Sequence, residues 1–142
     1  MIKKCLCIST SLMLLLFAVI CHAGDKYEEA REVFEQYLPA MEKYLDAVDK
    51  CNGPKELTIA INAFADSMEA IAPKMKKLEE KYPELKNEQA APPEYADLEK
   101  KSEALGQRFG QSFSRIAPFM DDPEVQKANE RLAGIMDTMD SE

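Results

Sequence analysis

Apolar residues recur in alternating steps of three and four along the chain from about residue 25 onward. The clearest run is Leu57, Ile61, Phe64, Met68, Ile71, Met75, Leu78 and Tyr82. Such steps place side chains on one face of an α-helix, because 3.6 residues complete a turn. Four runs of this kind predict helices at about 25–51, 54–82, 93–120 and 123–139, and no alternating run predicts a strand.

The residues between these runs predict where the helices begin and end. Gly53 is expected in the left-handed conformation that follows a helix, and Pro54 in the first turn of the next. Asp122, just before Pro123, is expected to cap the last helix. Because the connections after the first and third helices are short, consecutive helices should run antiparallel. The sequence therefore predicts an all-α protein, an antiparallel up-down-up-down four-helix bundle in which residues 24–142 form one domain.

A proline followed two residues later by a methionine occurs three times, at Pro39, Pro73 and Pro118. Residues 64–75 and 109–120 are identical at six of twelve positions around the second and third of these prolines. Each proline falls on the outward position of its heptad. Because proline removes one backbone hydrogen bond, we expect kinked helices that curve around the core with the rings outside it.

The N-terminus has the order of a secretory signal peptide. Lys3 and Lys4 precede an uncharged segment from Cys5 to Cys21, and the small residue Ala23 closes the segment. We expect residues 1–23 to be removed by cleavage after Ala23, and the protein to reach the bacterial periplasm or the outside. A retained membrane anchor is an alternative, and so is a lipoprotein acylated at Cys21, although Ile20 occupies the place where that signal has a small residue.

Removal of residues 1–23 changes the inventory of reactive groups. The chain loses two of its 18 Lys and Arg residues and none of its 26 acidic residues, so the net charge goes from −8 to −10. It also loses its one histidine, His22, and three of four cysteines, leaving Cys51 either buried or in an intermolecular disulfide. Without histidine, His-based catalysis and His-ligated zinc are excluded, and the acidic charge argues against nucleic acid. We expect no enzyme, no cofactor and no membrane span in the mature form.

An exported helical bundle of this size resembles the periplasmic four-helix haem proteins, the small b-type and c-prime cytochromes. The resemblance covers the helical layout alone. Those families carry an axial histidine near the C-terminus, where this chain offers Asn129, Leu132 and Met136. The resemblance therefore implies a fold and no haem.

Methionine is the remaining candidate for metal chemistry. Counting residues along the helices places four methionines near mid-height, namely Met41, Met68, Met136 and Met139. A layer of thioethers could bind Cu(I), which prefers soft ligands. Methionine also fills gaps in ordinary cores. The pattern leaves both interpretations open and favours packing.

These observations favour a non-enzymatic binding or interaction protein of the bacterial envelope, as a monomer or weak dimer. Its partner would be an envelope protein or a small ligand that the sequence does not identify. The alternatives are a carrier of a small apolar ligand or Cu(I) in a Met-lined core, and the lipoprotein acylated at Cys21.

Overall fold

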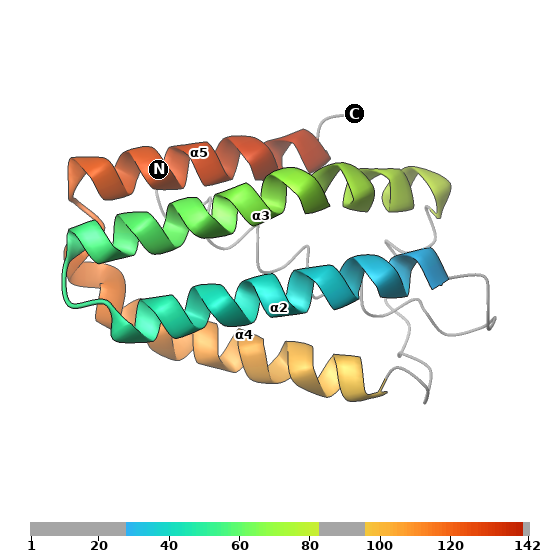
Figure 1. Cartoon of the computed structure of the whole chain (residues 1–142), viewed down its shortest axis with the longest axis horizontal. Coiled ribbons are helices and arrows are strands. Elements are labelled where there is room, and N and C mark those ends of the chain that lie inside the picture. The colour runs from blue at the N-terminus through green and yellow to red at the C-terminus, as the bar shows by residue number, and fades with distance from the viewer. Residues whose placement is uncertain (1–27, 83–95, 141–142) are drawn as a thin grey trace.

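The computed structural model describes residues 28–82 and 96–140, and these residues are almost entirely helical (Figure 1). The helices are α2 (Glu28–Lys50), α3 (Pro54–Lys81), α4 (Ala96–Ile116) and α5 (Pro123–Asp140), with the short 3-10 helix η5 (Ala117–Phe119) between the last two. The all-helical prediction is confirmed. The signal peptide, the cleavage site at Ala23 and the acylation candidate Cys21 lie outside the described residues.

The helix ends follow from local hydrogen bonds. Pro54 takes the first position of α3, as expected, but Gly53 is extended with φ of −170° and ψ of 174°, so the left-handed prediction is wrong. The backbone N–H of Asn52 donates instead to Glu56 Oε2 at 2.6 Å, which links the two sides of the turn. Asp122 caps α5 as predicted, because its Oδ1 accepts the N–H of Glu124 at 2.9 Å.

The three prolines have two different consequences. Pro39 and Pro73 lie inside α2 and α3 and are exposed, which confirms their outward position. At Pro118 the prediction of one helix to residue 120 is wrong, because α4 ends at Ile116 and the chain continues as η5. Proline has no N–H to continue the α-helical ladder. The chain therefore forms the tighter turn of a 3-10 helix there, and the backbone N–H of Met120 donates to the carbonyl of Ala117 at 3.3 Å.

The helices lie in the order α5, α3, α2, α4 from top to bottom of Figure 1. An ion pair at 2.7 Å between Lys81 and Glu29 joins opposite ends of α3 and α2, which are therefore antiparallel. By contrast, α4 packs beside α2 and α5 beside α3, and each pair runs in the same direction. Helices α4 and α5, although joined by a short connection, therefore pack mainly on other helices and not on each other. Fourteen residues separate α3 from α4, and at about 3.3 Å per residue they are long enough to reach the far side of α2.

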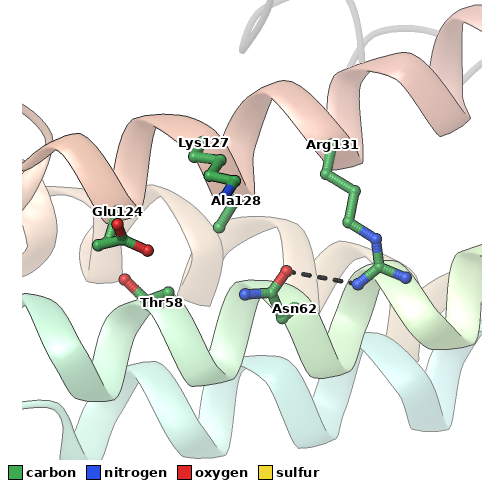
Figure 2. Close-up of a pocket in the computed structure, with 6 residues that line it drawn as sticks. All are labelled: Thr58, Asn62, Glu124, Lys127, Ala128 and Arg131. Carbon is green, nitrogen blue, oxygen red and sulfur yellow. Dashed lines mark hydrogen bonds between the residues drawn. The ribbon is translucent and has the colours of Figure 1, made fainter.

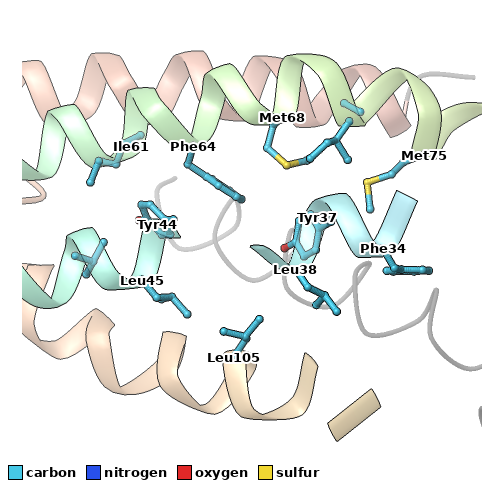
Figure 3. Packing of buried hydrophobic residues seen from close by; sticks show 14 of the residues in the cluster. Phe34, Tyr37, Leu38, Tyr44, Leu45, Ile61, Phe64, Met68, Met75 and Leu105 are labelled. Atoms are coloured by element: carbon cyan, nitrogen blue, oxygen red, sulfur yellow. The ribbon is translucent and has the colours of Figure 1, made fainter. Parts of the chain in front are cut away.

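The core lies mainly between α2 and α3, whose inward residues are almost fully buried (Figure 3). At its centre the ring of Phe64 stacks on Tyr44 with centroids 5.0 Å apart. The same ring meets Tyr37 edge-on at 6.4 Å. The two outer helices add fewer fully buried apolar residues, namely Leu105, Ile116, Val125 and Ala128.

Candidate interaction surface

The outer helices and the segment between them carry most of the apolar residues that are only partly buried against the core. These are Leu98, Phe109, Phe119, Met120, Leu132, Ile135 and Met136, against Ala40, Met41 and Ala47 on α2. Phe113 on α4 is 39% exposed, and among the described residues the other exposed large apolar side chain is Ile59 on α3, at 60%.

The apolar spacing of the third predicted helix, which runs through Leu105, Phe109, Phe113 and Ile116, predicts a buried Phe113, and this prediction is wrong. The repeat aligns Phe113 with Met68, which is fully buried, and predicts an inward position for both. In the structure Ser112 is buried together with Leu105 and Ile116, and Phe113 lies one residue, or about 100°, around the helix. The steps of seven and four from Leu105 to Ser112 to Ile116 carried the correct signal. An apolar pattern does not reveal this position, because the buried residue there is a polar serine.

The contact between α4 and α2 is rich in charge. Arg108 donates through Nε to Asp49 Oδ2 at 2.9 Å and pairs with Asp46 at 2.7 Å. The hydroxyl of Ser112 donates to Asp49 Oδ1 at 3.0 Å, and Arg115 donates to the backbone carbonyl of Asp49. The hydrogen bond from Arg108 is the main cause that lowers the pKa of Asp49, partial burial opposes it, and Ser112 adds to the lowering. Asp49 is thus the point at which α4 is fixed on α2.

Sequence reasoning missed this cluster, although heptad spacing of charges could have found it. Lys101, Arg108 and Arg115 are seven residues apart on α4, and Glu42 and Asp49 are seven apart on α2. The first cation pairs with the first acid, since Lys101 lies 3.1 Å from Glu42. Because α2 and α4 are parallel, the equal spacing of seven residues brings a basic and an acidic side chain together at each repeat, about every two helical turns.

A shallow hollow of about 180 Å³ lies between α3 and α5 (Figure 2). Its lining is polar apart from one alanine, and consists of Thr58, Asn62, Glu124, Lys127, Ala128 and Arg131. Arg131 closes one end, because its guanidinium donates to Asp66 and Glu69 at 2.6 Å each and to Asn62 at 3.3 Å. These hydrogen bonds hold Arg131 of α5 against α3, so its side chain links the two helices.

The four methionines singled out by sequence occupy different environments. Met68 is fully buried, whereas Met41 and Met136 are partly buried, and the side chain of Met139 lies outside the description. The pairing of Glu29 with Lys81 places Met41 level with Met68. Figure 3 shows Met68 and Met75 reaching from α3 toward the side chains of α2. In the described ranges, no three His, Cys, Asp or Glu side chains gather as a metal site would require.

Cys51 is buried at the end of α2, with 7% of its surface exposed. Its Sγ donates to the carbonyl of Ala47 at 3.2 Å. Burial raises the pKa of the thiol, and the nearby Glu56 carboxylate acts in the same direction. The thiol is therefore held in its neutral, unreactive form, because the thiolate is the nucleophile.

Between residues 28 and 82 and between 96 and 140, no helix combines the length and the apolar character that a membrane span requires. Comparison with protein-family profiles, curated protein sequences and solved structures found no match for the chain.

Proposed function

We propose that the protein is a non-enzymatic binding protein of the bacterial envelope that engages an envelope protein through α4 and η5. The observation that carries this proposal is the exposure of Phe113 in the C-terminal half of α4, where that half and the segment after it also hold the partly buried Phe109, Phe119 and Met120. Aromatic side chains that contribute most to protein–protein affinity sit in such patches. Extended apolar patches on a protein surface often mark interaction sites.

The proposal also covers the cleavage of the N-terminal segment, the location of the mature protein and its oligomeric state. The protein is exported, cleaved after Ala23, and works in the periplasm or outside as one up-down-up-down helical bundle, residues 24–142, in which consecutive helices run antiparallel. It is a monomer or weak dimer before it meets its partner. The intact mass of protein isolated from its own compartment tests this, since a chain that begins at Gly24 supports cleavage. A chain that begins at a diacylated Cys21 supports the lipoprotein alternative instead.

Capture from a solubilised envelope fraction tests the binding role. We expect immobilised protein to retain a partner, and the substitution Phe113→Ser to remove most of it. The matched control is Ile59→Ser on α3, because Ile59 is the other exposed large apolar residue of the described ranges, with 60% of its surface accessible. Loss with Phe113→Ser and retention with Ile59→Ser supports the proposal. Equal capture by both variants contradicts it.

A second candidate function is a carrier of Cu(I) or a small apolar ligand in the core. It is favoured by one observation, the placement of Met41 level with the fully buried Met68. Competition with a chromogenic Cu(I) chelator under reducing conditions tests the metal version. A carrier should withdraw Cu(I) from the chelator and lose this ability on Met68→Leu, whereas a packing role predicts no withdrawal by either protein.

A further inference from the structure

Carboxylates recur along one face of α2, with one gap at Pro39. They recur at steps of three, four and seven, at Glu28, Glu32, Glu35, Glu42, Asp46 and Asp49. These steps keep the side chains on one face of the helix for its whole length. We call this face the acidic track.

Helix α4 covers only the C-terminal half of the acidic track. There Lys101 pairs with Glu42, and Arg108 pairs with Asp46 and Asp49. Beside the ion pairs, Leu105 and Ile116 are buried in the cluster that includes Leu38 and Leu45 of α2. The N-terminal half of the track, formed by Glu28, Glu32 and Glu35, is exposed.

Helix α4 packs less closely on α2 than α5 does on α3. Besides Leu105 and Ile116 it buries the polar Ser112, which bonds to Asp49. Exposed ion pairs contribute little to stability, because water and salt screen them. The backbone of α5, in contrast, follows that of α3 closely, with Val125 and Ala128 buried between them. Local opening of a protein starts where an element has few contacts with the rest of the fold, and the looser packing of α4 on α2 meets this criterion.

We propose that the acidic track of α2 is a docking site for a basic amphipathic helix of a partner protein, and that α4 is its releasable intramolecular occupant. Charge complementarity identifies the partner helix. It carries Lys or Arg at heptad spacing beside a leucine, as α4 does, and a longer helix of this kind also neutralises the exposed N-terminal half. Helix-in-groove recognition uses this combination of apolar and charged contacts. The inference goes beyond the proposed function, because it assigns a second binding surface, on α2, and the chemistry of the partner that fits it.

Fluorescence anisotropy with a labelled peptide of residues 96–116 tests the track directly. In the wild-type protein the tethered α4 competes at an effective concentration on the order of 1 mM. The substitution Arg108→Glu places a carboxylate against Asp46 and Asp49 and so repels α4 while leaving the track intact. We expect this variant to bind the peptide at least tenfold more tightly than wild type. Added Asp46→Asn and Asp49→Asn substitutions should reverse the gain, and a variant that binds no better than wild type overturns the proposal.

Hydrogen exchange of the wild-type protein tests release of α4 without any substitution. We expect the amides of α4 to exchange at least tenfold faster than those of α3, and faster again when salt is raised. Protection of α4 equal to that of α3 at both salt concentrations overturns the proposal. Neither measurement involves Phe113 or a natural partner. A partner can therefore be captured through Phe113 even if the amides of α4 stay protected from exchange. That result would support the proposed function and overturn only the proposal about the acidic track.

Discussion

The ring of Phe64 makes the two aromatic contacts that fix the register of α2 on α3, and the substitution Phe64→Leu removes both. Aromatic pairs of this geometry contribute about 0.5–1.5 kcal/mol each beyond the burial of area. The stacked contact with Tyr44 at 5.0 Å should be the stronger, and the edge contact with Tyr37 at 6.4 Å lies near the outer limit for such pairs. We therefore expect a loss of about 1–3 kcal/mol in the free energy of unfolding.

Urea unfolding followed by far-ultraviolet circular dichroism measures this loss. With a urea dependence of about 2 kcal/mol per molar, a loss of 2 kcal/mol lowers the midpoint by about 1 M. A double-mutant cycle with Tyr44→Leu isolates the stacked pair, and we expect a coupling energy of about 0.5–1.5 kcal/mol. The same cycle with Tyr37→Leu should give a smaller coupling energy. Coupling near zero for Tyr44, or larger for Tyr37 than for Tyr44, would refute the register described for α2 and α3.

Three further predictions concern pH, the thiol and a helix cap. Burial raises the pKa of Tyr44 to about 12 from 10.0, so its contribution to stability is complete below pH 10 and is lost between about pH 10 and 12. The urea midpoint should fall over that range, and fall less in Tyr44→Phe. Cys51 should react with a thiol reagent only after denaturation, and a non-reducing gel should show no dimer band; rapid reaction of the native protein would contradict its burial. The substitution Asp122→Ala should cost about 1 kcal/mol by removing the cap of α5, whereas Asp121→Ala, beside it, should change the urea midpoint little.

The steps of three and four were sufficient to predict the helices, because burial of one face is what stabilises a helix in a small domain. They did not predict which helices pair. Pairing depends on side-chain contacts between helices, and Arg108 with Asp49 and Arg131 with Asp66 join segments that lie about 60 residues apart in sequence.

The candidate surface was predictable only in part. The outward position of Phe113 follows from Ser112 occupying the seam, and a serine there is stable because Asp49 accepts its hydrogen bond. That acceptor belongs to another helix, so the apolar pattern of α4 alone assigned the wrong residue to the core. The outward positions of Pro39 and Pro73, in contrast, depend on one helix each and were predicted correctly.

Site-specific photo-crosslinking in living cells tests most directly whether the protein acts by binding through α4 and η5. A photoreactive amino acid replaces Phe113 in one strain and Ile59 in another, since both side chains are accessible. The binding function predicts a discrete crosslinked species with the probe at position 113 and none with the probe at position 59. No adduct at position 113, or the same adducts at both positions, would contradict it.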